Sequence, residues 1–281
     1  MYQALYRKWR PQTFADVIGQ QHITDTLRAQ LQSGRLSHAY LFTGTRGTGK
    51  TTCAKILARA VNCEHPVNGD PCNECAACRG ILDGSVLDVT EIDAASNNGV
   101  ANIRDLRDET RYTPAQVRKR VFIIDEVHML SIGAFNALLK TLEEPPEHVL
   151  FILATTELHK VPATILSRCQ RFDFRRIGAE DISRRLLDVA AGEGIALTEG
   201  AARLIARLAD GAMRDALSML DRAAAAGAVD EKTVTAALGV MGQDDGIRLA
   251  EHLKTGDLAA AVGLLDEYYN AGRDLASVYD Q

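Results

Sequence analysis

Residues 44–51 of the chain read Gly44-Thr45-Arg46-Gly47-Thr48-Gly49-Lys50-Thr51, which is a glycine, four further residues and then Gly-Lys-Thr. An apolar run at residues 39–42 precedes this stretch, and residues of helical character at 52–58 follow it. A strand, a glycine-rich loop and a helix in this order form the setting of a phosphate-binding P-loop. An ordinary glycine-rich turn before a helix is the alternative, and the Lys-Thr pair at this offset disfavours it. The stretch therefore predicts a nucleoside triphosphate site.

The predicted loop has the groups that a magnesium-bound triphosphate requires. Its glycines let backbone N–H groups turn inward around a phosphate, and the helix that follows adds partial positive charge at its N-terminus. Lys50 would reach the β- and γ-phosphates, and the hydroxyl of Thr51 would bind Mg²⁺. We therefore expect nucleotide contacts from every residue between Gly44 and Thr52.

The composition is that of a globular protein with room for about two domains in its 281 residues. Hydrophobic residues make up 46% of the chain, charged residues make up 25%, and the formal net charge is −5. Any nucleic-acid contact must therefore come from a local basic patch. The chain has no apolar run of membrane-spanning length and no signal-peptide core at its N-terminus. A cytoplasmic protein without a membrane partner is the simplest expectation.

Four of the six cysteines are clustered, namely Cys63, Cys72, Cys75 and Cys78. Two disulfides are one interpretation, but they suit a secreted mini-protein better than a reduced cytoplasm. Short Cys-x-x-Cys spacings favour thiolate coordination of a metal, either in an iron–sulfur cluster or around zinc. We predict zinc, because the segment is a polar loop rich in turn residues and shows no sign of a redox partner. Four cysteines leave no position for water, so the zinc would be structural.

Apolar runs of strand length alternate with helical stretches in the first part of the chain. The runs lie at residues 39–43, 86–92, 121–125, 149–155 and 172–174. Continuous apolar runs suit strands that are buried on both faces, and their alternation with helices predicts an α/β fold with a parallel sheet flanked by helices. Ligands of such sheets bind at the carboxyl ends of the strands, where the P-loop follows the first run.

The pattern changes near Gly178, after which only helical periodicity remains. Apolar stripes that begin at Ile182, Leu204 and Met213, with a helical run at 231–238, predict a small helical domain. A turn at 192–194 and a cap at Thr198 would separate its first two helices. Beyond a linker at 239–245, amphipathic helices are expected at 247–253 and 258–268, and residues 275–279 have the pattern of a further helix. This last pattern stops midway, so we expect the chain to be a fragment of a longer protein.

The apolar run at 121–125 ends in two carboxylates, Asp125 and Glu126. An acidic residue at the tip of a strand beside a P-loop holds Mg²⁺, which suits Asp125, and Glu126 is placed to orient and polarise the attacking water. A simple cap for the next element is the alternative, and the upstream P-loop disfavours it. His128 is either a coupling residue or a packed histidine, and we favour packing.

With these motifs the chain resembles the gamma/tau ATPase subunits of the bacterial DNA polymerase III clamp loader, which belong to the AAA+ family. The resemblance runs from residues 5–11, Leu-Tyr-Arg-Lys-Trp-Arg-Pro, to the end of the chain. The P-loop and the Asp-Glu pair alone would indicate only an NTPase. The more specific features are the clustered cysteines, the stretch 135–146 (Phe-Asn-Ala-Leu-Leu-Lys-Thr-Leu-Glu-Glu-Pro-Pro), Ser167-Arg168-Cys169 and Met213-Arg214-Asp215.

The resemblance implies roles for further residues. Thr156, with Thr155 as its near rival, matches the sensor 1 position near the γ-phosphate. Arg214 matches sensor 2, which touches the nucleotide of its own subunit, and Arg168 matches the arginine finger, which reaches the nucleotide of a neighbouring subunit. The segments 6–11 and 17–19 resemble the wall beside the adenine base, to which we assign Arg10, Pro11, Val17 and Ile18.

The resemblance also implies an architecture and an activity. The expected domains are an AAA+ nucleotide-binding domain at 1–178 with a zinc module at about 62–79, a helical lid at 179–241, and part of a helical collar at 242–281. The cofactors would be ATP, Mg²⁺ and Zn²⁺. A hetero-pentamer of clamp-loader subunits would use ATP to open the sliding clamp and load it onto primer–template DNA during DNA replication. Longer forms bind the polymerase core and the replicative helicase through a C-terminal region that is missing here.

In such an assembly DNA would be gripped through its phosphate backbone. The stretch before the Asp-Glu pair is basic, with Arg104, Arg107, Arg111, Arg118, Lys119 and Arg120. A solvated helix face explains these charges equally well. An AAA+ helicase or branch-migration motor is the alternative enzyme, which the zinc insert and the Ser-Arg-Cys run disfavour. A scaffold that binds nucleotide without turning it over is the second alternative, which Lys50 and Glu126 disfavour.

Overall fold

The computed structural model describes residues 2–225, 227–239 and 243–270. The chain divides into two compact units. Arg10–Ile177 form one of them, which we call the sheet unit. The residues up to Trp9, together with those from Gly178 onward, form the other, which we call the helical unit. The P-loop and the clustered cysteines both belong to the sheet unit.

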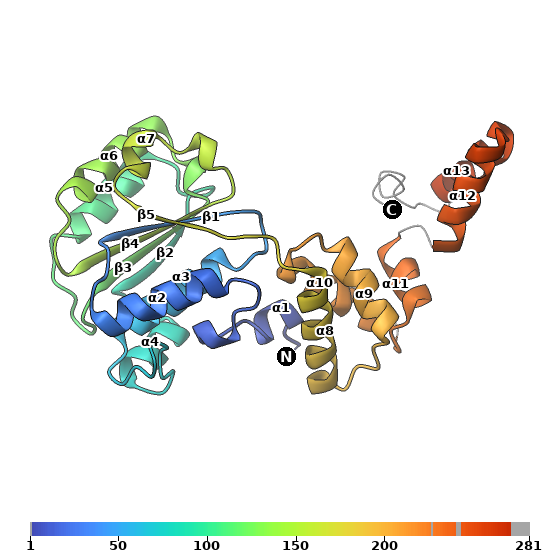
Figure 1. Ribbon diagram of the computed structural model, residues 1–281. Coiled ribbons are helices and arrows are strands. Elements are labelled where there is room, and N and C mark those ends of the chain that lie inside the picture. Colours follow the sequence, from blue (N-terminus) through green and yellow to red (C-terminus); the bar gives the residue numbers. More distant parts are fainter. Residues whose placement is uncertain (1, 226, 240–242, 271–281) are drawn as a thin grey trace. The chain divides into compact units, whose positions relative to one another are not determined.

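The sheet unit contains a five-stranded parallel sheet with the strand order β2-β3-β4-β1-β5 (Figure 1). Its strands are β1 (Ala39–Thr43), β2 (Val89–Asp93), β3 (Arg120–Asp125), β4 (Val149–Thr155) and β5 (Gln170–Asp173). All residues of β1 and β4 are buried, because both strands lie inside the sheet and carry apolar side chains on both faces. The edge strands β2 and β5 are more exposed and more polar.

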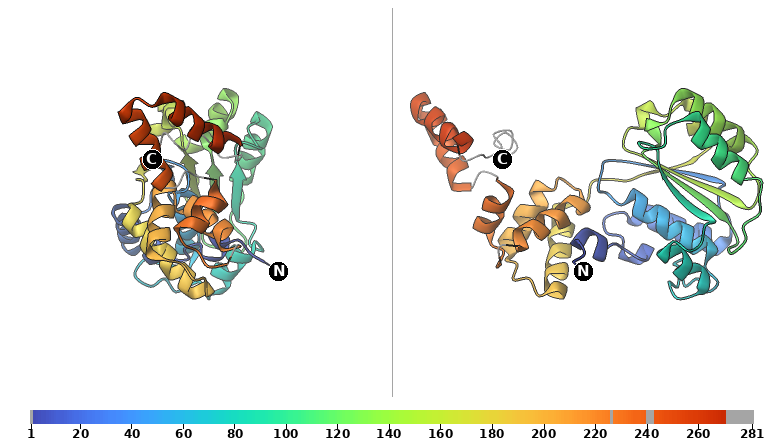
Figure 2. Two further views of the ribbon diagram at one scale, coloured as in Figure 1. Left: turned by 90° about the vertical axis from the view of Figure 1, so that its right-hand side faces the viewer. Right: turned by 180° about the vertical axis from the view of Figure 1, so that it is seen from behind.

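Helices cover both faces of this sheet, as Figures 1 and 2 show. The helical segments of the unit are η1 (Phe14–Asp16), α2 (Gln21–Ser33), α3 (Lys50–Asn62), α4 (Ala76–Asp83), α5 (Val100–Glu109), η2 (Val127–Met129), α6 (Ile132–Glu143), η3 (Leu158–Lys160) and α7 (Ala163–Leu166). α2 and α3 pack on one face, against strand residues such as Phe42 and Ile152. α5, α6 and α7 pack on the opposite face, against Leu41 and Phe151. Neighbouring residues of one strand thus serve opposite layers, as the period of two requires.

The helical unit is built from amphipathic helices. They are α1 (Leu5–Lys8), α8 (Ala179–Glu193), α9 (Glu199–Leu208), α10 (Met213–Ala224), α11 (Glu231–Leu238), α12 (Gln243–Thr255) and α13 (Leu258–Asn270). Each of α8 to α11 turns buried residues inward, such as Leu186, Ile205 and Leu220. Thr198 caps α9, because its side chain accepts a hydrogen bond from Ala201 N. α12 and α13 share a small apolar cluster. Among the described residues, no helix combines the length and the apolar character that a membrane span requires.

The predicted parallel sheet and the helices after it are confirmed, and several boundaries were wrong. β2 begins at Val89 and not at residue 86, because Leu87 is 84% exposed beside this edge strand. The first two residues of the predicted turn at 192–194 belong to α8, which ends at Glu193 with Gly194 as its left-handed C-cap. Gly192 allows this helix to pass Trp9, whose ring would lie 2.5 Å from an added Cβ. α12 begins at Gln243, inside the predicted linker, and the helix expected at 275–279 lies outside the described residues.

One buried ion pair joins the start of β3 to the loop before β2. Asp88 is 4% exposed and accepts hydrogen bonds from Ala115 N and Gln116 N at 2.9 and 3.0 Å. The Arg120 guanidinium donates to its other oxygen at 2.7 Å. Burial raises the pKa of Asp88, but these hydrogen bonds outweigh it, so that the pKa lies below its usual value. The charged form of Asp88 is therefore the stable one in the folded protein.

The substitution Asp88→Asn should destabilise the chain by about 3 kcal/mol at pH 7, because it leaves the Arg120 charge buried without its partner. A lowered folded pKa adds stability above the unfolded pKa of about 4, and this stability is lost as the pH falls through the folded pKa. The difference between wild type and variant should therefore shrink below about pH 4. Urea unfolding followed by circular dichroism at several pH values measures it. Asp105→Asn, on the exposed face of α5, is the control, and equal losses in both variants would contradict the assignment.

Candidate functional site

The P-loop joins β1 to α3 at the carboxyl edge of the sheet. Gly44 N donates to Thr155 O on the neighbouring strand at 3.3 Å, which fixes the start of the loop. Gly44 has φ 144°, and a Cβ there would lie 2.3 Å from the carbonyl oxygen of Phe174, so that only glycine fits. Gly49 then takes the left-handed conformation immediately before α3. The predicted order of a strand, a glycine-rich loop and a helix is therefore confirmed, as β1, the P-loop and α3.

Lys50 is the first residue of α3 and is 6% exposed. Its Nζ donates to the carbonyl oxygens of Gly44 and Thr45, both at 2.8 Å, so the ammonium lies within the loop. Burial lowers the pKa of Lys50, and the charges of Glu126 and Asp125 act in the opposite direction. A desolvated ammonium group is a strong partner for a phosphate oxygen.

Gln20 ties the P-loop to the segment after β5 by hydrogen bonds, and this role was not predicted from the sequence. It is fully buried, and its amide nitrogen donates to Arg175 O at 2.7 Å and to Thr48 O at 3.4 Å. Its amide oxygen accepts from Arg175 N at 3.1 Å. Gln20 and Arg175 are 155 residues apart in sequence, so no local pattern could have revealed this contact.

The loop and the acidic strand tip meet directly. Thr51 Oγ1 donates to Asp125 Oδ2 at 2.6 Å, although 74 residues separate them in the chain. β3 and β1 both pair with β4 in parallel, which brings their carboxyl ends to the same edge. A hydroxyl and a carboxylate in contact beside a phosphate-binding loop can hold a hydrated Mg²⁺.

Glu126 follows Asp125 and has a left-handed backbone, with φ 47° and ψ 44°. Its Oε2 accepts a hydrogen bond from Thr156 Oγ1 at 3.0 Å, and the Thr156 backbone N–H lies at 3.4 Å. His128 Nδ1 lies 3.4 Å from the same oxygen and 3.0 Å from Thr155 Oγ1, while its Nε2 lies 3.2 Å from Glu157. The two rival threonines therefore have different partners, and Thr156 is the one that contacts Glu126. The imidazole is packed, as we favoured, and it also touches the carboxylate.

Arg168 lies after α7 on the surface of the sheet unit, and its side chain is 33% exposed. Its guanidinium donates to Glu143 at 2.8 Å and to Thr164 O at 2.8 Å. The neighbouring Cys169 is packed against the core, and burial raises the pKa of its thiol to about 12. In the Ser-Arg-Cys run, the Arg168 side chain is therefore partly exposed, while the next residue, Cys169, packs against the core.

Arg214 lies at the start of α10 in the helical unit, whereas the P-loop belongs to the sheet unit. Its guanidinium lies 5.0 Å from the centre of the Tyr6 ring, in a cation–π contact. Tyr6 lies in one of the segments that we placed beside the adenine base. The members assigned to that wall lie in the sheet unit, where Val17 is buried in the core and Arg10 donates to Thr52 Oγ1 at 3.1 Å.

The basic stretch before β3 does not form a free cationic face as a whole. Arg120 pairs with Asp88, and Arg107 and Arg111 lie near Asp108. The ammonium of Lys119 donates to a backbone carbonyl oxygen of the loop before β4. The interpretation as a solvated, internally paired face accounts for these contacts without DNA.

The four clustered cysteines come together as predicted. The sulfur atoms of Cys63, Cys72, Cys75 and Cys78 all lie within 4.8 Å of one another, and no disulfide joins them. Four thiolates around a zinc ion at about 2.3 Å would have sulfurs about 3.8 Å apart, which is close to this arrangement. Backbone N–H groups of Cys72, Cys75 and Cys78 donate to sulfur atoms at 3.2–3.5 Å. Backbone hydrogen bonds lower the pKa of the Cys72 thiol to about 6, whereas burial raises the pKa of the Cys63 and Cys78 thiols. This four-cysteine cluster could hold a metal ion, and its donor set suggests zinc.

The loop that carries the four-cysteine cluster is fastened to the sheet unit by Asp70, a contact that the sequence did not predict. Asp70 accepts from Phe14 N at 2.5 Å and forms an ion pair with Arg28 of α2. Gly69 permits this approach, because a Cβ there would lie 2.8 Å from the backbone of Arg28. The loop therefore does not depend on a metal alone for its attachment.

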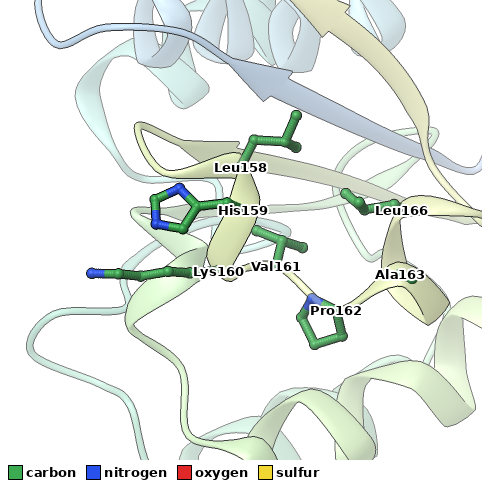
Figure 3. Close-up of a pocket in the computed structure, with 7 residues that line it drawn as sticks. All are labelled: Leu158, His159, Lys160, Val161, Pro162, Ala163 and Leu166. Carbon is green, nitrogen blue, oxygen red and sulfur yellow. The ribbon is translucent and has the colours of Figure 1, made fainter.

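A surface pocket follows β4 and contains none of the predicted site residues (Figure 3). It is lined by Leu158, His159, Lys160, Val161, Pro162, Ala163 and Leu166. His159 and Lys160 point to one side of the segment, away from Leu166. The pocket lacks a P-loop or an acidic pair, so it gives no argument for nucleotide binding.

Comparisons with known proteins show the family to which the chain belongs. The family described as "DNA polymerase III, delta subunit" matches residues 19–178, and the family described as "DNA polymerase III clamp loader subunit, ATPase lid domain" matches residues 181–229. DNA polymerase III subunit tau of Bacillus subtilis is 56% identical over 99% of this chain, and that of Escherichia coli is 49% identical over 95%. The chain spans only 50% and 42% of the length of these two relatives.

A shorter relative and a solved structure extend the comparison. DNA polymerase III subunit gamma of Buchnera aphidicola is 44% identical over 96% of this chain, which covers 76% of that protein. The RuvB Holliday junction branch migration motor of Thermotoga maritima superposes with a TM-score of 0.63 over 91% of this chain and 85% of that chain. Its identity is only 17%, so this likeness concerns the fold alone. The relatives and the family matches show that the chain belongs to the gamma/tau family of DNA polymerase III clamp-loader subunits, of which it forms the N-terminal AAA+ region.

Proposed function

We propose that this chain is the ATP-hydrolysing part of a replicative clamp-loader subunit. It would use ATP binding and hydrolysis to open the ring-shaped sliding clamp and to load it onto primer–template DNA. The observation that carries the proposal is the contact of Thr51 with Asp125 beside the buried Lys50, in a chain of the gamma/tau family. These groups meet at the edge of a parallel sheet where such folds bind their ligands.

Each residue of the edge has a chemical role in this proposal. Residues 44–52 would surround the triphosphate, and Lys50 would offset its negative charge. Thr51 and Asp125 would hold Mg²⁺, which neutralises charge on the transferred phosphoryl group. Glu126 would accept a proton from the attacking water, and Thr156 would position its carboxylate. Arg10, Pro11, Val17 and Ile18 would border the adenine, and Arg214 would reach the nucleotide of its own subunit.

Arg168 would act on the nucleotide of a neighbouring subunit. Its surface position and its partly exposed ion pair with Glu143 leave the guanidinium within reach of another chain. An arginine supplied in trans makes hydrolysis depend on assembly, because the transition-state charge is unpaired until the neighbour arrives. The proposed assembly is a hetero-pentamer in the cytoplasm that contacts the clamp and the phosphate backbone of DNA. Longer forms would bind the polymerase core and the replicative helicase beyond residue 281.

The proposal includes the domain division at 1–178, 179–241 and 242–281, with zinc in the four-cysteine cluster. The alternative of a branch-migration motor has the fold in its favour, but the relatives at 44–56% identity are DNA polymerase III subunits. A scaffold that does not hydrolyse nucleotide would have no use for a carboxylate held beside the P-loop. Strand separation by the purified protein alone would favour the motor instead.

The test of the proposed function is the ATPase rate of the reconstituted clamp loader that contains the full-length subunit. Clamp and primed DNA together should stimulate hydrolysis, and clamp alone or DNA alone should stimulate it less. Turnover that is absent in every assembly would favour the scaffold. Calorimetry on the chain itself should show MgATP binding, and its absence from folded protein would refute the nucleotide site.

Glu126→Gln should lower the maximal ATPase rate of the assembly by about 10²–10⁴, because the amide cannot accept the proton of the attacking water. ATP affinity should change little, since the amide keeps the shape of the side chain. Glu109→Gln, at the end of α5, is the matched control and should keep the wild-type rate. Unchanged turnover in the Glu126 variant would remove the role assigned to it.

Arg168→Ala should lower the clamp- and DNA-stimulated rate by about 10³–10⁵, the contribution of an arginine finger. Arg171→Ala removes an exposed arginine three residues further along the chain, and its stimulated rate should match wild type. Both proteins are compared within the reconstituted assembly at saturating ATP. A rate equal to wild type for Arg168→Ala would refute the finger assignment.

Elemental analysis should find about one zinc ion per chain, bound by the four cysteines. Cys75→Ser should lose most of this zinc, because a structural site needs all four thiolates. Cys169→Ser removes a thiol outside the cluster and should keep the zinc. Iron and inorganic sulfide in place of zinc would instead support the iron–sulfur interpretation.

A further inference from the structure

Arg59 is a buried cation whose hydrogen-bond partners are uncharged. It lies on α3, the helix that begins at the P-loop, and is 4% exposed. Its Nε donates to Asn73 Oδ1 at 3.1 Å, and its Nη2 donates to Gln12 O and Gln12 Oε1 at 3.0 and 3.2 Å. Among the described residues no carboxylate forms an ion pair with it. A buried charge without a counter-charge is costly, so its environment needs an explanation.

The four-cysteine cluster is a source of negative charge close to Arg59. Asn73, the partner of Arg59, lies between the ligands Cys72 and Cys75, in the left-handed conformation with φ 59°. A divalent cation held by four thiolates retains net negative charge, which an adjacent guanidinium would offset. Burial lowers the pKa of Arg59 to about 10, and the Cys78 sulfur acts in the opposite direction. Arg59 therefore has the position and the sign of a counter-charge for a loaded cluster.

The same hydrogen bonds continue from the cluster to the nucleotide site. Asn73 Nδ2 donates to Gln12 O at 3.2 Å, so that Gln12 O receives both Asn73 and Arg59. Gln12 Nε2 donates to Arg10 O at 3.0 Å. Arg10 Nε donates to Thr52 Oγ1 at 3.1 Å, and Thr52 follows the predicted Mg²⁺ ligand. Every link lies within the sheet unit.

We propose that Arg59 couples metal occupancy of the four-cysteine cluster to nucleotide binding at the P-loop, with Gln12 and Arg10 as the connecting residues. This inference rests on the proposed ATP site. A loaded cluster orders the turn that carries Asn73, and Asn73 with Arg59 then holds the main chain of Gln12. Without the metal, Arg59 lacks its counter-charge and the turn lacks its ligand bonds, so the N-terminal segment is held less firmly against α3. Arg59 is a positioning residue, because it touches neither the nucleotide nor the metal.

The coupling is tested in both directions on the full chain under reducing conditions. Because coupling is reciprocal, MgATP should raise the affinity of the chain for zinc against a competing chelator, and so slow the extraction of zinc. Zinc should tighten the binding of a fluorescent ATP analogue by the same factor in affinity. We expect a factor of at least about five, the lower end of ordinary coupling between sites. Zinc release is followed with a coloured chelator and does not depend on turnover.

Four variants separate the links. Gln12→Ala should keep its zinc but lose most of the effect of MgATP on extraction. Arg59→Met should lose zinc faster than wild type even without nucleotide. Arg59→Lys restores the charge, so its rate of zinc loss should lie between those of wild type and Arg59→Met. Arg79→Met removes an exposed arginine beside Cys78 on α4 and should behave as wild type. Circular dichroism confirms that each compared protein is folded.

Three outcomes overturn the inference. If wild type binds the analogue but MgATP leaves the extraction rate unchanged, the coupling is refuted while the nucleotide site stands. If Arg79→Met and Arg59→Met lose zinc equally fast, simple positive charge near the cluster explains the effect, and the assignment to Arg59 falls. Absence of analogue binding to folded wild type would refute the proposed function as well.

Discussion

The parallel pairing of β1 and β3 with the same strand, β4, is the constraint on which the site depends. Parallel strands end at one edge, so the loop after β1, the carboxylates at the end of β3 and the threonines at the end of β4 lie close together. The distances reflect this: Gly44 N lies 3.3 Å from Thr155 O, and Thr51 Oγ1 lies 2.6 Å from Asp125. A shift of β3 by one residue would turn Asp125 toward the opposite face and exchange the side chains that serve the two helical layers.

The residues assigned to nucleotide chemistry differ in how firmly the chain holds them. Lys50 is buried and bonded to its own loop, and Glu126 is held by Thr156 with His128 beside it. Arg168, in contrast, has a partly exposed ion pair with Glu143, and such pairs contribute at most about 1 kcal/mol. A phosphate on a neighbouring chain could replace Glu143 at little cost. In the proposed assembly, the groups that act within one chain would thus be fixed before the subunits meet, and the arginine that would complete the site of the neighbour would be free to exchange its partner.

The sequence predicted what local patterns encode. All five strands overlap the apolar runs, because strands buried on both faces read as continuous apolar stretches, and the four clustered cysteines are close in sequence. The errors lie where tertiary packing overrides composition, as at Gly192, which continues α8 past the ring of Trp9. The supports of the site were not predictable in this way. Asp70 and Phe14 are 56 residues apart, and Gln20 and Arg175 are 155 apart, so neither contact leaves a local signal.

The loop that carries the four-cysteine cluster is an integral part of the sheet unit. Asp70 fastens one side of the loop to α2 and to the start of η1, independently of the sulfur atoms. Asn73 and Arg59 fasten the other side to α3 and to Gln12. The N-terminal segment that carries Arg10 therefore has two attachments to the loop. Asp70 forms the first through Phe14 and Arg28, and Asn73, which lies beside the cysteines, forms the second through Gln12. Because Asn73 lies between Cys72 and Cys75, a change in metal occupancy of the cluster would act on the attachment that continues to Thr52 and not on the one held by Arg28.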